Sequence, residues 1–169
     1  MCNLAFYKNN HYKYYMEIIK PDLKPELLAD TKTKALYDQL QHLLNELDKK
    51  KISEETVQKI NSETAAISAT SLRDKDLYKM LKQKQTGIIK LLEKEHKIVP
   101  KNYYRNLWLA AGMGAFGLPI GVAFGLLMGN IALLSIGLPI GMGIGVAVGT
   151  SLDKKAEAEG RQLDVEIKA

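Results

Sequence analysis

Apolar positions recur at helical spacing through the first hundred residues. From about Pro25 onward, three segments place them at intervals of three and four residues, the pattern of amphipathic helices. The stripes consist of Leu36, Leu40, Leu43, Leu44 and Leu47; of Val57, Ile60 and Ile67; and of Leu77, Met80, Leu81, Ile88, Leu91 and Leu92. Ser53 is a good N-cap for the second helix, and Pro100 ends the third. With a shorter helix expected before Pro21, we predict a small cytosolic helical bundle over residues 1–100.

The pattern changes after Arg105. No charged residue occurs between Arg105 and Asp153, and this gap holds 11 of the 13 glycines. Such a run is about twice the ~20 residues that one membrane-spanning helix needs. We therefore predict an all-α fold in which a connector at 101–106 leads into a transmembrane hairpin at 107–152. Its spans are expected at 107–128 and 131–152, followed by a charged cytosolic tail at 153–169.

The ends of the predicted spans indicate their orientation. Gly129 and Asn130 lie between the spans, where glycine suits a helix end and asparagine the next N-cap. Basic residues flank the pair on both outer sides, and positive residues stay on the cytoplasmic side. Both termini are therefore expected in the cytoplasm. Aromatic anchors at the membrane interface are expected at Tyr103, Tyr104 and Trp108.

Glycine recurs at every fourth position of both spans. The two series are Gly117, Gly121, Gly125 and Gly129, and Gly137, Gly141, Gly145 and Gly149. Small residues along one face let helices pack closely in lipid. In a hairpin that turns at 129–130, Gly117 should face Gly141, and Gly121 should face Gly137. Three further glycines, Gly112, Gly114 and Gly143, are expected on other faces.

The two spans also contain an internal repeat. GLPIGVAFGLLMG at 117–129 recurs as GLPIGMGIGVAVG at 137–149, with Pro119 and Pro139 in matching places. A proline leaves one carbonyl without its helical donor and can kink the helix. Two interpretations stay open at this point. Both helices bend in order to pack, or matched kinks widen one end, as a pore would need.

These motifs resemble a known group of membrane proteins. The paired GxxxGxxxGxxxG runs, within NYYRNLWLAAGMGAFGLPIGVAFG and GLPIGMGIGVAVGTSLDKKAEAEGRQLD, are similar to the bacterial glycine-zipper transmembrane-hairpin proteins. The resemblance covers about residues 102–164. It implies a multi-pass protein of the bacterial inner membrane with a helical cytosolic region, and it brings no catalytic residues.

Charge and candidate chemistry narrow the function. Up to Arg105 the chain has 20 Lys and Arg against 14 Asp and Glu, an excess that suits a domain beside anionic lipid. These lysines are interleaved with acids, so no nucleic-acid partner is expected. Cys2 is the only cysteine, and His11, His42 and His96 lie far apart. With no phosphate-binding loop or nucleophile motif either, we expect no metal, no cofactor and no enzymatic activity.

Two functions remain. The first is a membrane-anchored interaction or scaffold protein, whose cytosolic domain binds an unknown cytosolic protein or a second copy. The alternative is an oligomeric pore or membrane-perturbing effector that the cytosolic domain gates. The spans lack polar residues to line a conducting path, and a purely apolar pore would dewet. This composition favours the first function.

Overall fold

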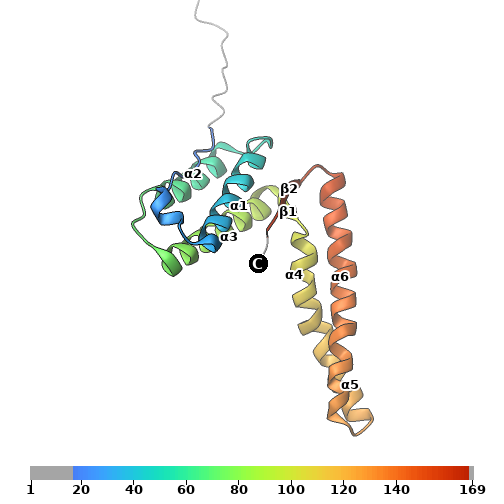
Figure 1. The fold of residues 1–169 in the computed structure, drawn as a ribbon. Coiled ribbons are helices and arrows are strands. Elements are labelled where there is room, and N and C mark those ends of the chain that lie inside the picture. Colours follow the sequence, from blue (N-terminus) through green and yellow to red (C-terminus); the bar gives the residue numbers. More distant parts are fainter. Residues whose placement is uncertain (1–16, 168–169) are drawn as a thin grey trace, which may run out of the picture.

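The structure, a computed structural model, describes residues 17–167. A helical bundle stands at one end of a long helical hairpin (Figure 1). The bundle contains a 3₁₀ turn η1 (Pro25–Leu28) and the helices α1 (Thr31–Leu47), α2 (Glu54–Ser68) and α3 (Asp74–His96). The hairpin contains α4 (Tyr103–Gly112), a π-helical turn η2 (Met113–Gly117), α5 (Leu118–Leu127), a 3₁₀ turn η3 (Ile131–Leu133) and α6 (Leu134–Ala158). Two short strands, β1 (Val99–Lys101) and β2 (Gln162–Glu166), join the two parts. The prediction of an all-α fold is confirmed.

The predicted stripes form the core of the bundle. Side chains of all three helices are fully buried, among them Leu40, Leu44, Ile60, Leu81 and Leu92. The expected helix before Pro21 lies mostly outside the described residues, and residues 17–24 form no helix. The long first helix begins at Thr31, later than Pro25, because Asp30 caps it by accepting a 2.8 Å hydrogen bond from the Thr33 N–H.

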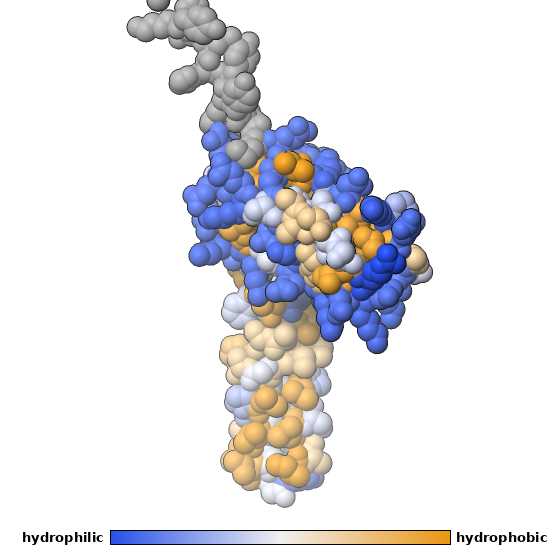
Figure 2. Space-filling view, turned by 90° about the vertical axis from the view of Figure 1, so that its left-hand side faces the viewer, coloured by the Kyte–Doolittle hydropathy of each residue, from blue (hydrophilic) through white to orange (hydrophobic). Residues whose placement is uncertain are grey.

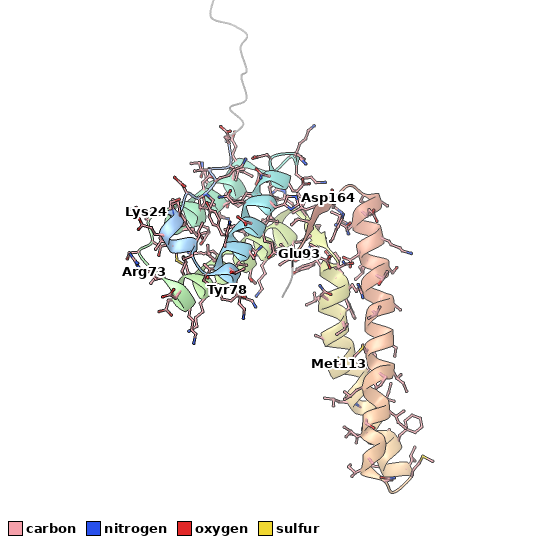
Figure 3. All side chains as sticks on the ribbon, in the orientation of Figure 1. Lys24, Arg73, Tyr78, Glu93, Met113 and Asp164 are labelled. Carbon is pink, nitrogen blue, oxygen red and sulfur yellow. The ribbon has the colours of Figure 1, made fainter. Side chains whose placement is uncertain are left out.

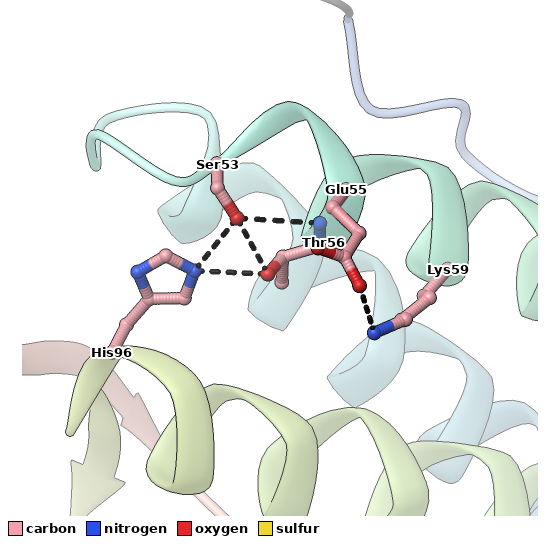
Figure 4. Close-up of polar contacts among 5 residues, drawn as sticks. All are labelled: Ser53, Glu55, Thr56, Lys59 and His96. Carbon is pink, nitrogen blue, oxygen red and sulfur yellow. Dashed lines mark hydrogen bonds and ion pairs between the residues drawn. The ribbon is translucent and has the colours of Figure 1, made fainter.

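A small polar cluster fixes α2 against the end of α3 (Figure 4). Ser53 caps α2 as predicted, since its side chain accepts a hydrogen bond from the Thr56 N–H. The His96 Nε2 lies 2.9 Å from the Thr56 hydroxyl and 3.4 Å from the Ser53 hydroxyl. These contacts join the N-terminus of one helix to the C-terminus of another, so His96 has a structural place in the bundle.

The predicted charged tail is wrong, because β2 is part of the bundle. This strand pairs in parallel with β1, with Val99 opposite Gln162 and Pro100 opposite Leu163. Alternate residues of a strand point to opposite faces. Leu163 and Val165 therefore enter the hydrophobic core of the bundle, where both are buried. The bundle thus consists of residues from both sides of the hairpin and does not end at residue 100.

Polar contacts hold β2 and the turn that leads into it. Lys50 donates a 2.6 Å hydrogen bond to the Gly160 carbonyl, and Gln39 donates one of 3.1 Å to the Glu166 carbonyl. An ion pair joins Lys101 of β1 to Asp164 of β2 and holds the pKa of the Asp164 carboxyl below its usual value. Since these partners come from α1, the α1–α2 connection and β1, the strand is anchored to three separate parts of the bundle.

The parallel pairing explains the length of α6. To run parallel to β1, β2 must start level with Val99, which precedes α4 in the chain. The second hairpin helix must therefore extend past the start of the first. It continues to Ala158, where Gly160, with a φ of 68°, turns the chain toward β2.

Candidate functional site

The hairpin is the candidate functional site. Its two helical arms, Tyr103–Leu127 and Leu134–Ala158, are each long and apolar enough to cross a membrane. Both reach beyond the predicted spans. Residues 103–106 belong to α4 instead of a connector, and α6 runs six residues past the predicted end at 152. The extra turns lie at the base of the hairpin, where it meets the bundle (Figure 1).

Glycines bring the two arms into backbone contact. Gly117, Gly121, Gly137 and Gly141 are all buried. A Cβ atom on Gly137 would lie 2.6 Å from the Cα of Gly121, and one on Gly141 would lie 2.6 Å from the Cα of Gly117. Cβ contacts below 3.0 Å are essentially never seen in proteins. No other residue fits these positions without moving one backbone.

The contact continues toward the base but not to the tip. Cβ atoms on Gly145 and Gly149 would clash with backbone, lying 2.8 Å from the carbonyl carbon of Trp108 and 2.5 Å from the Cα of Arg105. Near the tip, a Cβ on Gly125 would be in ordinary contact range, 3.5 Å from the Asn130 carbonyl oxygen.

Gly129, predicted as a packing residue, does not lie in this contact. It has a φ of 63°, and a Cβ placed on it would meet nothing within 4 Å, so it serves the turn. Asn130 follows as the predicted N-cap, accepting a 3.0 Å hydrogen bond from the Ala132 N–H.

The sequence pattern missed Gly112. A Cβ on this residue would lie 2.8 Å from the Cα of Gly145, so Gly112 belongs to the packing face. It stands five residues before Gly117, one more than the repeat of four allows. The π-helical turn η2 absorbs this extra residue: the Leu118 N–H bonds the Met113 carbonyl, five residues back. A five-residue glycine spacing beside a repeat of four was the signal for it.

The two prolines do not produce matched interruptions. Pro119 lies in the first turn of α5, directly after the π-helical turn, whereas α6 continues through Pro139 without a break. Both side chains are exposed on the outer surface of the hairpin. The two copies of the repeat therefore differ in structure. Only the first arm contains a π-helical turn, because only there must two glycines five residues apart, Gly112 and Gly117, lie on one face.

Asp153 closes the base of the hairpin. Asn102, which precedes α4, makes no side-chain cap. The buried Asp153 of α6 takes over this role, since its two carboxylate oxygens accept hydrogen bonds from the N–H groups of Tyr104 (3.0 Å) and Arg105 (2.9 Å). A negative charge is also favourable at the positive end of a helix dipole. In the sequence, Asp153 marks only the boundary of the apolar run.

Of the predicted aromatic anchors, two contact the bundle. Tyr103 packs against the hydrophobic core, and its ring meets that of Tyr104 edge to face with centroids 5.3 Å apart. The Tyr104 hydroxyl lies 3.4 Å from a carboxylate oxygen of Glu93 in α3. Trp108, one turn further on, is half-buried beside Gly145. These residues form the junction between bundle and hairpin, so the two parts are held together by side-chain contacts as well as by the chain.

Replacement of Asp153 by alanine should loosen the base of the hairpin. The substitution leaves two partly buried N–H groups without their acceptor, which costs about 2–3 kcal/mol. We expect amide hydrogen exchange at Tyr104 and Arg105 to accelerate by about 30-fold or more, as measured by NMR in micelles. Asp164→Ala is the matched control, because its ion pair with Lys101 is exposed and contributes under about 1 kcal/mol. Equal exchange in both variants would contradict the capping role.

No protein-family model, curated protein or solved structure matches this chain.

Proposed function

We propose that the protein is a membrane-anchored interaction protein. The hairpin crosses a bacterial inner membrane twice, and both chain termini lie in the cytoplasm. The hairpin holds the bundle at the cytoplasmic surface, where the bundle serves as a scaffold that binds a cytosolic protein.

One observation carries this proposal: the outer surface of the hairpin is apolar and uncovered. Only 22% of the most apolar window in each arm is buried, whereas the core helices of soluble proteins are mostly buried. Exposure is highest near the tip, at 75% for Leu126, 84% for Leu127 and 73% for Ile131. Figure 2 shows hydrophobic colours along the hairpin and mostly hydrophilic ones over the bundle. An apolar surface of this extent needs lipid or protein to cover it.

The distribution of charge supports the orientation. Lys101 and Arg105 stand at the start of the first arm, and Lys154 and Lys155 near the end of the second. The tip has no charge. Positive residues at the base favour a cytoplasmic bundle. Among the described residues, the glycine faces of the two arms pack against each other, and β2 completes the core of the bundle. Neither contact uses the outer surface of the bundle, which is therefore available to a partner.

Cysteine accessibility in intact bacterial cells tests the insertion and orientation. Cys2 is replaced by serine, and one cysteine is placed either at the tip, Met128→Cys, or on the bundle, Gln58→Cys. A membrane-impermeant maleimide should label the tip in cells with a permeabilised outer membrane, and the bundle only after lysis. The protein should also resist alkaline extraction. Extraction into the soluble fraction, or labelling of the bundle before lysis, would overturn the proposal.

Partner binding needs its own experiment. Photocrosslinkable residues at exposed bundle positions, such as Gln58 and Gln83, should capture a cytosolic protein in cells. The same residue at Met142, in the middle of the hairpin, is the control. Crosslinks only to a second copy at all three positions would contradict the scaffold role.

One observation favours the alternative of an oligomeric pore or membrane-perturbing effector. Gly114 and Gly143 are exposed, and nothing lies within 4 Å of a Cβ placed on either. Bare backbone on a lipid-facing surface permits close approach of another helix, hence of a second copy. This alternative predicts dye leakage from vesicles that contain the purified protein. Tight vesicles at high protein loading would exclude it.

A further inference from the structure

The exposed side of α3 is rich in lysine. Between Asp76 and Glu93 the helix has four lysines and no Asp or Glu. Lys84 turns toward α2, where it forms a 2.5 Å ion pair with Glu63. The other three, with one from the preceding turn, are exposed within an arc of about 80° on the helix surface. We call them the lysine face: Lys75, Lys79, Lys82 and Lys90. Asp76 lies beside this face as the partner of Lys79, and Glu93 lies on the same side of the helix beyond Lys90, where it pairs with Lys97.

The lysine face is poorly neutralised by the rest of the bundle. Among the described residues, Lys75, Lys82 and Lys90 make no ion pair, and Lys79 has only the exposed Asp76 at 3.9 Å. A shallow groove runs along α3 between Tyr78 and Lys90 and is lined by three of the four lysines. A Cβ placed on Gly87 would meet nothing within 4 Å, and the missing side chain leaves the floor of the groove open. The surface is therefore positive, accessible and slightly concave.

The hairpin fixes the direction in which this face points. α3 is the bundle helix on the side toward which the hairpin extends (Figure 1). Its C-terminal part is held to the hairpin base by the contact between Glu93 and Tyr104, and Tyr103 packs on the bundle core. Tyr78 lines the same groove as Lys79 and Lys82, and it lies on the lower side of α3 in Figure 3. A bilayer that takes up the hairpin would thus meet this side of the bundle with its headgroups.

We propose that the lysine face of α3 binds the anionic phospholipid headgroups of the bilayer in which the hairpin lies. This inference rests on the proposed membrane insertion and adds a second contact, which fixes how the bundle is seated on the surface. Each lysine near an anionic leaflet contributes a factor of about five to the attraction. The long lysine side chains reach the phosphates while their stems stay along the groove. Among polyanions, lipid is favoured because the hairpin holds the face beside it, whereas a soluble polyanion would have to enter between bundle and membrane.

Headgroup quenching of a dye on α3 tests this seating. The full-length chain, with Cys2→Ser and a single fluorophore on Gln83→Cys, is placed in nanodiscs of neutral phosphatidylcholine or of a mixture with phosphatidylglycerol. Both contain a trace of lipid with a nitroxide headgroup. We expect quenching to increase with the anionic lipid and to fall again at high salt. The double variant Lys82→Gln/Lys90→Gln should reduce the ratio of seated to released bundle by roughly 25-fold.

Matched controls separate the possible results. A dye on Gln58→Cys in α2 should be quenched less, and neutralisation of Lys51 and Lys59 should leave the Gln83 signal unchanged. A dye on Met142→Cys, quenched by acyl-chain nitroxides, reports insertion of the hairpin. If Met142 is not quenched, the proposed membrane insertion itself fails. If Met142 is quenched but Gln83 shows no dependence on anionic lipid, only the present inference is overturned, and the lysine face is left to a soluble polyanion or an acidic protein.

Discussion

Gly137→Leu should separate the two arms of the hairpin. Its side chain would start within 3 Å of the Gly121 backbone, where only a backbone shift could make room. Overpacking of this kind costs about 1–3 kcal/mol, and more where the obstacle is main chain. We expect the variant to unfold at a lower mole fraction of SDS in mixed micelles. The emission of Trp108, the only tryptophan, follows the transition, because this residue packs beside Gly145 at the same contact.

Gly143→Leu is the matched control for this experiment. It lies in the same helix and adds the same side chain, but nothing stands within 4 Å of its Cβ position. Leucine also has the higher helix propensity, so the control should unfold at the wild-type SDS fraction or above it. Equal destabilisation by both substitutions would show that bulk in the helix matters and that the facing backbone does not.

Leu163→Ala should destabilise the bundle, although the residue lies beyond the hairpin in the sequence. Its side chain is fully buried in the core. Removal of buried leucine methyl groups typically costs about 2–5 kcal/mol, a large share of the stability of a small domain. We expect a lower urea midpoint in a non-ionic detergent, measured by circular dichroism. The Val99 N–H, which donates a 3.0 Å bond to the Arg161 carbonyl, should exchange faster as β2 loosens.

The control for Leu163 is another leucine truncation outside the core. Leu72, in the connection between α2 and α3, is 41% exposed, and its replacement by alanine should change the midpoint little. A wild-type midpoint for Leu163→Ala would mean that β2 is a peripheral attachment. In that case residues 1–100 alone should fold with full stability, whereas the structure leads us to expect that they do not.

The parts of the fold that the sequence predicted are those set by strong periodicity. Leucines at intervals of three and four leave little choice of buried face, so α1 and α3 were predicted with their core residues. β2 was missed because a five-residue strand offers only Leu163 and Val165 as alternating apolar positions, among three charged or amide-bearing residues. Nothing local distinguishes such a segment from a solvated tail. Its pairing depends on β1, which lies some sixty positions earlier in the chain.

The turn of the hairpin was predicted from the sequence, but two of its contacts were not. Its turn at Gly129–Asn130 follows from local preferences, and both residues have the turn and capping roles expected of them, although Gly129 lacks the packing role that the repeat of four also predicted. Gly112 was misplaced because a strict repeat of four ignores the π-helical turn, whose extra residue brings Gly112 back to the inner face. Asp153 could not be assigned from sequence, since the amides that it caps belong to another helix. Both errors concern contacts between distant segments, which periodicity along one helix does not contain.

The shared two-stranded sheet has a consequence for biogenesis. On the ribosome, β1 emerges before the two hairpin arms, and β2 emerges only after both. Until then the core lacks Leu163 and Val165, and the nascent bundle keeps an unfilled side next to an unpaired strand. Under the proposed membrane insertion, the apolar arms therefore reach the bilayer while the bundle is still incomplete. Closure of the sheet becomes the last step of maturation, and it succeeds only in molecules whose second arm has returned to the side of the first.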